Sequence, residues 1–378
     1  MGVYQQCSKC ILDINDDPNI SFDGSGVCNY CNSYDRIAEE HLFKSAQKEK
    51  KLAEIIASIK NAGRNNKYDC ILGVSGGVDS TYLAYKINKF GFRPLAVHLD
   101  NGWNSEIAVK NIDNVIKKLK FDLYTHVIDR EEFRNLQLAY LKASVVDVEA
   151  ITDHAIMAIL YRMATHNRIR YIISGANIVT ESILPQHWYF NKGDHKNIKA
   201  INKEYGAAPL KTFPLFDSIS KFRCFYTFKI SNISLLDYIA YNKDEAKKII
   251  TQELDWHDYG GKHYESIFTR FYQGYILPRK FGIDKRKAHL SNLICSGQIA
   301  RDRALEEFKK PAYDPEQFKV DYIFVLKKLD LSSDEFEKIM DIPIREHTEF
   351  PIEKPLHTQP FLRVIKLLRD SLRINSRS

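Results

Sequence analysis

Between residues 67 and 176, short apolar runs alternate with longer segments whose apolar residues recur at helical spacing. The apolar runs lie at 68–74, 93–100, 121–128 and 170–176, and the helical patterns lie at 80–89, 106–119, 131–142 and 147–164. Strands that alternate with helices predict an α/β fold, a doubly wound parallel sheet with helices on both faces. Ligands of such sheets bind beyond the carboxyl ends of the strands, so we expect the site among the residues that follow each run.

The segments on either side of this alternation have different patterns. Residues 1–33 are rich in Cys, Asp, Asn and Gly, and residues 34–59 have helical periodicity. After residue 191 the sequence is polar and turn-rich, then aromatic and helix-rich, and an amphipathic helical pattern lies at 361–374. We therefore expect four parts: an N-terminal module (1–33), a linking helix (34–66), an α/β domain (67–215) and a helix-rich substrate-binding C-terminal region (216–378).

Composition is that of an ordinary packed protein. With 378 residues, 44% of them hydrophobic, the chain has ample material for a core. No stretch approaches the roughly 18 uninterrupted apolar residues of a membrane span, and the N-terminus lacks the layout of a secretory signal. We therefore expect a cytoplasmic protein. The net charge of +7 fits a scattered basic surface as well as a polyanionic partner such as ATP, a nucleotide sugar or RNA.

Four of the seven cysteines form two close pairs near the N-terminus, Cys7–Cys10 and Cys28–Cys31. Each Cys-x-x-Cys pair can direct two thiolates at one ion, and two pairs complete the tetrahedron of a zinc ribbon or knuckle. Because four protein ligands leave no open position, we expect a structural Zn²⁺; an iron–sulfur cluster is the alternative. The remaining cysteines are expected to be small buried residues: Cys70, Cys224 and Cys295.

A glycine-rich loop follows the first predicted strand. Its candidate ligand-binding residues are Ser75, Gly76, Gly77, Val78, Asp79, Ser80 and Thr81. A strand, a glycine turn and a helix create an anion site, because free backbone N–H groups point outward at the positive end of the helix dipole. An acid among these donors implies that Mg²⁺ accompanies the anion. The spacing matches neither a Walker A loop nor a Rossmann loop.

The sequence SGGVDS at 75–80 resembles the PP-loop of the ATP pyrophosphatase superfamily, which has an adenine nucleotide alpha hydrolase-like fold. The resemblance implies that the loop holds the β,γ-pyrophosphate of ATP while a substrate oxygen attacks the α-phosphate. VHLDNGW resembles the adenine-side segment of this superfamily, and ISGAN resembles its fourth-strand loop. These segments add four ATP-binding candidates: His98, Asp100, Gly175 and Asn177. For His98 and Asp100, capping of the strand end is an equally good account.

The stretch from Trp256 to Leu305 distinguishes among PP-loop enzymes. It places basic side chains among aromatic residues and glycines, which suits an anionic, hydroxyl-rich ligand. Two helices with solvated charges account for the pattern nearly as well. Together with the cysteine pairs, the PP-loop and GANIVTES, it resembles the N-acetyl sugar amidotransferases of bacterial surface-polysaccharide biosynthesis. The resemblance covers nearly the whole chain, most firmly residues 5–305.

This second resemblance implies an AMP-forming, ATP-dependent sugar amidotransferase. The acetamido oxygen of an N-acetylated sugar, either nucleotide-linked or a free nonulosonic acid, is adenylated, and ammonia then displaces AMP to give an acetamidino sugar for LPS O-antigen or another surface glycan. Adenylation is needed because an amide oxygen is a poor leaving group. No glutaminase motif is visible, so ammonia should come from a partner, which in this family resembles a histidine-biosynthesis-type glutaminase with a cyclase-like companion.

Further candidates follow from these resemblances. The catalytic candidates are Asp79, Lys262 and Lys285. The substrate-binding candidates are Thr180, Glu181, His263, Glu265 and Arg286. The basic residues would contact the substrate anion or neutralise charge in the transition state, and Lys211 would neutralise the leaving phosphate or simply be a surface lysine. No general base stands out, and ammonia attack needs only desolvation and positioning.

Two rival functions fit parts of the pattern. A PP-loop tRNA thiolation enzyme would suit the basic charge and the zinc module, but it calls for reactive or cluster-binding cysteines near the loop. A non-catalytic zinc-ribbon scaffold or RNA-binding protein has no use for the complete SGGVDS loop. We therefore expect an enzyme that acts on a small molecule, with no nucleic acid partner.

Overall fold

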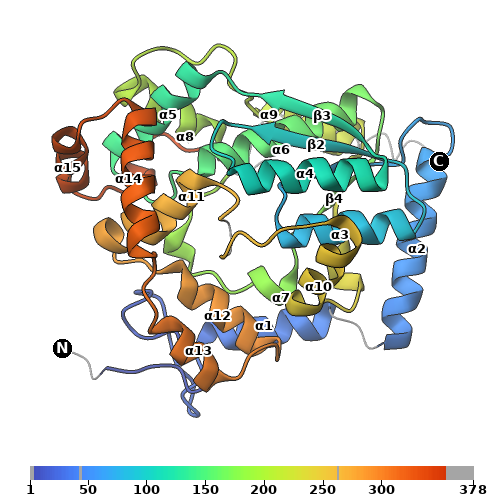
Figure 1. The fold of residues 1–378 in the computed structure, drawn as a ribbon, viewed down its shortest axis with the longest axis horizontal. Coiled ribbons are helices and arrows are strands. Elements are labelled where there is room, and N and C mark those ends of the chain that lie inside the picture. Colours follow the sequence, from blue (N-terminus) through green and yellow to red (C-terminus); the bar gives the residue numbers. More distant parts are fainter. Residues whose placement is uncertain (1–3, 42–44, 262–263, 355–378) are drawn as a thin grey trace, which may run out of the picture.

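The computed structural model describes residues 4–41, 45–261 and 264–354, and its centre is a parallel sheet (Figure 1). The strands are β1 (Cys70–Gly73), β2 (Pro94–Asp100), β3 (Asp122–Val127), β4 (Tyr171–Ser174) and β5 (Ser231–Ser234). Their order is β3-β2-β1-β4-β5, and every neighbouring pair is parallel. The chain thus leaves β1 in one direction to reach β2 and β3 and returns to its other side for β4 and β5.

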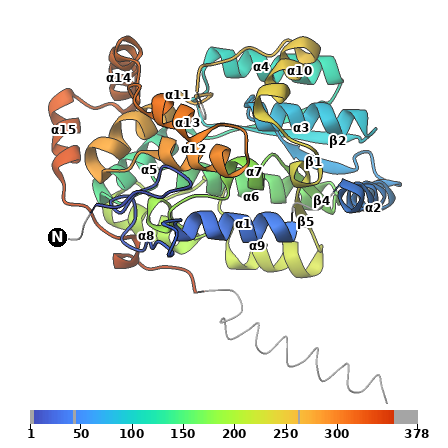
Figure 2. The same ribbon diagram turned by 90° about the horizontal axis from the view of Figure 1, so that it is seen from below.

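Helices cover both faces of the sheet, as Figure 2 shows. One face carries α3 (Val78–Lys89), α4 (Glu106–Leu119) and α10 (Lys243–Leu254), and the other carries α5 (Arg130–Ala143) and α6 (Ala150–His166). Successive strand residues point to opposite faces, so Ile71 packs in the core on the α6 side and Leu72 packs in the core under α3. Both residues are fully buried, which is why the central strands read as continuous apolar runs.

The doubly wound parallel sheet predicted from the sequence is confirmed. Its four predicted strands and the four helices among them are present, with ends shifted by at most three residues. The largest shift is at the start of α6, where Asp147 has a φ of 61°, a left-handed conformation that a helix cannot contain. Helix α3 begins two residues early, at Val78, so the glycine loop runs directly into its first turn.

A fifth strand, β5, was not predicted. Its sequence, Ser-Asn-Ile-Ser, has a single apolar residue, and the strand lies at the edge of the sheet, half exposed. It pairs with β4 along its whole length. Since β5 begins at residue 231, the sheet extends beyond residue 215, and the expected division at that position does not coincide with the end of the sheet.

The remaining elements surround this core. Before the sheet lie α1 (Asn29–His41) and α2 (Ser45–Gly63). After β4 come α7 (Ile178–Glu181), η1 (Gln186–Trp188), α8 (His195–Tyr205), α9 (Ser218–Phe222), η2 (Arg223–Thr227) and η3 (Leu235–Tyr238), where η marks a 3-10 or π-helical segment. After α10 come α11 (Ile267–Phe271), η4 (Tyr272–Phe281), α12 (Lys285–Cys295), α13 (Arg301–Phe308), α14 (Pro315–Leu329), α15 (Ser333–Asp341) and η5 (His347–Glu349).

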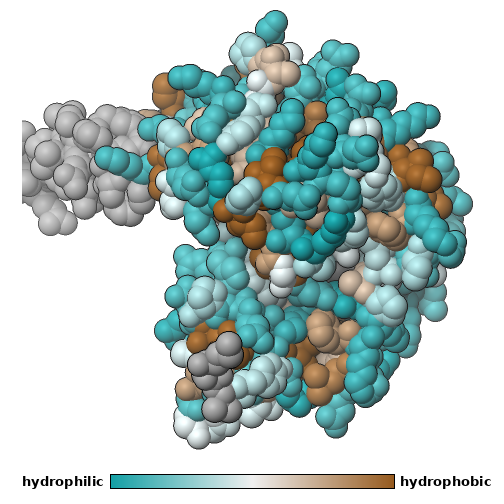
Figure 3. Space-filling view, turned by 90° about the vertical axis from the view of Figure 1, so that its left-hand side faces the viewer, coloured by the Kyte–Doolittle hydropathy of each residue, from teal (hydrophilic) through white to brown (hydrophobic). Residues whose placement is uncertain are grey.

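The C-terminal region is rich in helices over its described part, as predicted, and it also contributes strand β5. The amphipathic pattern at 361–374 lies outside the described residues. Across the described ranges, every helix is too short or too polar to cross a bilayer. The face that carries α14 and α15 is mostly hydrophilic, with hydrophobic side chains in small separate groups (Figure 3).

Candidate active site and metal centre

The glycine loop joins β1 to α3 and is held by its own hydroxyl groups. The Ser75 and Ser80 Oγ atoms lie 3.1 Å apart, and Ser80 Oγ donates to the carbonyl of Gly77 at 3.2 Å. Gly76 has a φ of 79°, and a Cβ atom there would lie 2.7 Å from the carbonyl oxygen of Ala108 in α4. Only glycine fits this position, because a side chain would be strained and would collide with backbone. The loop therefore passes close to α4 at a position where only glycine fits.

This loop lies where the strand order reverses, between β2 and β4. The loop after β4 meets it there: a Cβ atom on Gly175 would lie 3.1 Å from the amide nitrogen of Ser80. Helix α3 starts at Val78, so its first N–H groups and the positive end of its dipole face the end of the sheet. Together these features form an anion site of the kind that holds phosphates at a switch point.

Asp79 lies in the first turn of α3 and accepts a hydrogen bond from the hydroxyl of Tyr241, which precedes α10. Burial, and next the charge of Asp79, raise the pKa of Tyr241, so this hydroxyl keeps its proton and keeps donating. The Asp79 carboxylate and the neighbouring serine hydroxyls are hard oxygen donors. Such donors fit Mg²⁺ carried by a phosphate ligand, as the sequence predicted.

Trp256, Tyr259 and Glu265 contact the loop from the α4 side. Trp256 Nε1 donates to the carbonyl of Gly76 at 2.9 Å. A Cβ atom on Gly77 would lie 3.3 Å from the hydroxyl oxygen of Tyr259 and 3.4 Å from Oε1 of Glu265, so both side chains reach the loop. Glu265, predicted as a substrate-binding residue, is therefore beside the predicted phosphate site.

Sequence reasoning missed the aromatic residues that contact the loop. Tyr259 is held with its hydroxyl protonated, because burial and then the charge of Glu265 raise its pKa. Asn111 of α4 fixes the segment by bonding both the carbonyl (2.9 Å) and the amide (2.8 Å) of His257. The sequence contains little indication that these aromatic residues contact the glycine loop. The WHDYGG segment has aromatic side chains with polar ends, but its local pattern does not predict which residues they bond.

His98 and Asp100, predicted ATP-binding residues, have partners at the end of β2. His98 Nδ1 lies 2.9 Å from the carbonyl oxygen of Val74, and its Nε2 lies 3.0 Å from the side-chain nitrogen of Asn104. Burial lowers the pKa of His98, so the ring is neutral and bridges the start of the glycine loop to the β2 loop. Asp100 accepts from the amide of Gly102 at 2.8 Å. These contacts are those of strand-end capping.

The loop after β4 brings the next three candidates together. Asn177 caps the short helix α7, since its Oδ1 accepts from the amide of Thr180 at 2.9 Å and from the Thr180 hydroxyl at 3.1 Å. Thr180 is buried by this arrangement. After burial and Asp79, the charge of Glu181 also contributes to raising the pKa of Tyr241.

Lys285, a predicted catalytic residue, begins α12 and faces two carboxyl groups that precede α6. Its Nζ lies 3.9 Å from Oδ1 of Asp147. Glu149 accepts a hydrogen bond from Nε2 of Gln273 at 3.0 Å, and the charge of Lys285 also acts on it. Burial raises the pKa of Glu149. We call Lys285, Asp147, Glu149 and Gln273 the Lys285 cluster. Its two acidic residues were not predicted, because they lie more than 130 positions away from Lys285 along the chain.

The other basic candidates have no contact with the Lys285 cluster that the structure describes. Arg286 forms an ion pair with Asp284 at 2.7 Å and donates to the carbonyl of Lys310 at 2.7 Å, so its recorded contacts are with the ends of α12 and α13. Lys262 and His263 lie outside the described residues. Lys211 donates its backbone amide to Glu132 of α5.

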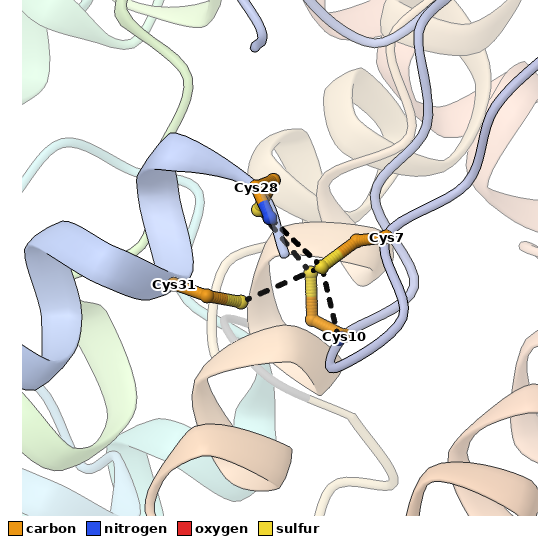
Figure 4. A group of neighbouring side chains, drawn as sticks. All are labelled: Cys7, Cys10, Cys28 and Cys31. Atoms are coloured by element: carbon orange, nitrogen blue, oxygen red, sulfur yellow. Dashed lines mark hydrogen bonds between the residues drawn. The ribbon is translucent and has the colours of Figure 1, made fainter. Parts of the chain in front are cut away.

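The four N-terminal cysteines converge on one point (Figure 4). All are fully buried, and their sulfur atoms lie within 4.8 Å of one another. Cys7 Sγ lies 3.9 Å from Cys31 Sγ, and Cys10 Sγ lies 3.7 Å from Cys28 Sγ. Sulfurs about 2.3 Å from a tetrahedral zinc ion are about 3.8 Å apart. The residues therefore fit Zn²⁺, and the predicted zinc module is compatible with the structure.

Backbone amides support this centre, and helices α12 and α13 hold it in place. The amide of Cys28 donates to Cys7 Sγ at 3.2 Å, which stabilises a thiolate. Lys287 of α12 bonds Asp13 and Asp16 at 2.7 and 2.9 Å. Arg301 of α13 donates to the carbonyls of two of the cysteines, Cys7 and Cys10, at 3.1 and 3.0 Å. Figures 1 and 2 show the dark-blue N-terminal segment beside these orange helices.

The fold and the loop define the class of site: a phosphate-binding turn at the switch point of a doubly wound sheet. Residues 265–365 match the family described as "LPS biosynthesis protein WbpG-like, C-terminal domain". The match confirms the predicted relationship to proteins of bacterial surface-polysaccharide biosynthesis. It begins at Glu265, the residue that reaches Gly77.

Two solved structures are similar to the chain at low identity. One is an NH3-dependent NAD synthetase from Campylobacter jejuni subsp. jejuni in complex with the nitrate ion (16% identity, TM-score 0.30), of which the chain covers 72% with 42% of its own length. The other is an NMN synthetase from Francisella tularensis (15% identity, TM-score 0.35), of which it covers 98% with 77% of its own length. No curated protein sequence matches the chain.

Proposed function

We propose that the protein is an ATP-dependent enzyme that forms a carbon–nitrogen bond on an N-acetylated sugar, as an AMP-forming amidotransferase. The observation that carries the proposal is the position of the segment Trp256–Glu265. Its residues Trp256, Tyr259 and Glu265 contact the predicted phosphate loop, and Glu265 is the first of the residues 265–365 that match a family of LPS biosynthesis domains. An ATP-type site is thus joined by a few residues to a region associated with surface glycans.

The reaction has two steps. The acetamido oxygen attacks the α-phosphorus of ATP, the bond to the β-phosphate oxygen breaks, and pyrophosphate leaves. Ammonia then adds to the imidate carbon, the carbon–oxygen bond breaks, AMP leaves, and a proton is lost from the attacking nitrogen. The product is an acetamidino sugar. The first step turns a poor leaving oxygen into a good one, which is what makes the second step possible.

The residues of the loop would bind the departing pyrophosphate. The hydroxyls of Ser75 and Ser80 and the first N–H groups of α3 supply donors, and Asp79 would hold Mg²⁺, which neutralises phosphate charge when bound. The glycines let the backbone approach the phosphates. In the ATP site, His98 and Asp100 shape the β2 loop, while Gly175 and Asn177 shape the loop after β4.

The acceptor would lie between the loop after β4 and the Lys285 cluster. Thr180 and Glu181 follow β4, and Glu265 and the cluster face the site from the C-terminal region. Lys285 would neutralise negative charge on the acceptor or on the departing AMP. Arg286 and the residues Lys262 and His263 are further candidates for the anion of the sugar nucleotide.

We also propose that ammonia comes from a separate glutaminase with a cyclase-like companion, and that the reaction takes place in the cytoplasm on a nucleotide-linked sugar for O-antigen or another surface glycan. The zinc centre is structural in this scheme, because all four positions around the ion are taken by cysteines. Nucleic acid has no part in it.

The rival tRNA thiolation function would need a reactive cysteine near the loop. Cys70, which precedes the loop in β1, and Cys224 are both buried. Neither can present its sulfur to a bound tRNA. Among the cysteines, all of which are described, the structure therefore offers no sulfur carrier at the loop.

ATP–pyrophosphate exchange tests the proposal. We expect labelled pyrophosphate to enter ATP when N-acetylated nucleotide sugars are supplied, and AMP to accumulate when ammonium is added. Supplying tRNA in place of the sugars should give no exchange. Exchange that needs tRNA would contradict the sugar assignment, and a lack of exchange with either would favour a scaffold.

Substitution of Lys285 by alanine tests the acceptor side. We expect kcat/KM for the sugar to fall by roughly 10²-fold, because a charge aimed at the reacting groups is lost, while KM for ATP changes little. Steady-state kinetics with each substrate varied in turn separate the two effects.

Lys309, the residue that follows α13, provides the matched control for this prediction. It is exposed and paired with Glu306, so Lys309→Ala should leave both constants unchanged. If Lys285→Ala raised KM for ATP and spared the sugar, Lys285 would belong to the nucleotide site.

A further inference from the structure

A fifth thiol lies against the four-cysteine centre. Cys295 is the last residue of α12, and its sulfhydryl donates to Cys31 Sγ with the two sulfur atoms 3.5 Å apart. This separation is no larger than the distances between the sulfurs within the centre, 3.7 and 3.9 Å. Cys295 stands 264 positions from Cys31, so only the fold brings them together.

Cys295 differs from every other cysteine in its exposure. All seven cysteines are described; six are buried, and Cys295 alone is partly exposed. A small oxidant in solution therefore meets this thiol first, and the four ligands of the centre lie behind it. The expectation that Cys295 is a small buried residue does not describe its position.

We propose that Cys295 is a redox modification site that forms a disulfide with Cys31 and thereby opens the metal centre. A hydroperoxide is the oxidant. It converts the Cys295 thiol to a sulfenic acid with release of water, and the Cys31 thiolate then attacks the Cys295 sulfur and expels hydroxide. In total two thiols lose two electrons, the peroxide is reduced, and one disulfide forms.

The consequence follows from the chemistry of the centre. A sulfur in a disulfide is no longer a thiolate ligand, so Cys31 would leave the set and three cysteines would remain. Zinc affinity should then fall steeply, since each thiolate contributes to a site closed on all sides. The proposal concerns the metal centre and does not depend on which acceptor the enzyme uses.

The modification would also affect the proposed acceptor site. Helix α12 carries Cys295 at its end and Lys285 at its start, and in between Asn292 bonds the amide and the carbonyl of Ile183 at 2.8 and 2.9 Å. Helix α12 thus connects the metal centre directly to the Lys285 cluster. Oxidation of Cys295 would thus affect the position of Lys285 through α12.

Oxidation of the reduced, zinc-loaded full chain tests the proposal. Hydrogen peroxide is added, released zinc is followed with a chromogenic chelator, and disulfides are mapped by mass spectrometry of peptides kept unreduced. We expect a Cys31–Cys295 peptide to form in step with release of about one zinc per chain, and a dithiol reductant with added zinc to reverse both.

Two serine variants provide the controls. Cys295→Ser keeps all four ligands, so it should bind zinc and unfold like the wild type but release zinc about ten-fold more slowly under peroxide. Cys224→Ser, which alters a buried thiol elsewhere, should behave as the wild type under peroxide. Zinc release at an unchanged rate from Cys295→Ser would overturn the proposal. Oxidation of Cys295 without a link to Cys31 would also overturn it.

Discussion

Replacing Asp79 with asparagine is expected to abolish ATP turnover while the fold persists. Asparagine keeps the size and one oxygen of the side chain but loses the charge that would hold Mg²⁺ at the phosphate loop. Loss of such electrostatic stabilisation costs roughly 10²–10³-fold in rate. The measurement is sugar-dependent ATP–pyrophosphate exchange, with a thermal unfolding curve of the same sample to show that the chain is folded.

Two further variants sharpen this prediction. Asp113→Asn removes a carboxylate on the exposed surface of α4, where Asp113 pairs with Lys117, so activity should be unchanged. Tyr241→Phe removes the hydrogen bond to Asp79 but keeps its charge, so the loss should be smaller than that of Asp79→Asn. Normal exchange by Asp79→Asn would remove this residue from the metal role.

Much of the sheet could be predicted because its central strands are buried on both faces. Ile71 and Leu72 point to opposite faces and are both fully buried, so the strand has to be apolar throughout and is visible in the sequence. Strand β5 pairs with β4 on one side only, and its side chains are exposed or half-buried. A mostly polar sequence, Ser-Asn-Ile-Ser, can therefore form this strand. Its assignment depends on pairing with β4, which no local pattern records.

The loop itself could be located from the sequence, whereas most of its partners could not. Gly76 has to be glycine for a local reason, its positive φ, although the collision that a side chain would suffer is with α4. Tyr241 and Trp256 lie 162 and 180 positions from the loop residues that they contact. Their contacts form only because the fold brings the segments on either side of α10 back beside the loop. In the sequence, this region is merely rich in aromatic residues, which does not predict those contacts.

The structure also gives the N-terminal module a role that spacing alone did not reveal. Cysteine spacing predicted the four ligands but no partner for the module within the chain. The partner is the pair α12–α13, through the ion pairs of Lys287 with Asp13 and Asp16 and the bonds of Arg301 to cysteine carbonyls. Since α12 begins with Lys285, the module supports the helix that carries the proposed acceptor lysine.

Replacing Cys28 with serine is therefore expected to remove zinc and to loosen α12 and α13 far more than the sheet. Serine leaves three thiolates, and a structural zinc site that loses a ligand loses much of the folding free energy that the metal supplies. We expect the free energy of unfolding to fall by roughly 4 kcal/mol or more. Zinc content per chain and the denaturant midpoint measure the two effects.

Hydrogen exchange shows where the stability is lost. Amide protection should fall in 285–308 and in the module itself, while the strands β1, β2 and β4 keep theirs, because one face of each strand packs in the core under α3, which contains none of the four module cysteines. Ser8→Ala, which removes an exposed hydroxyl bonded to the carbonyl of Ser25 in the same module, is the control and should change neither zinc content nor protection. A zinc-free Cys28→Ser chain with wild-type protection in α12 would show that the ion pairs of Lys287 and the bonds of Arg301 hold the helix without the metal.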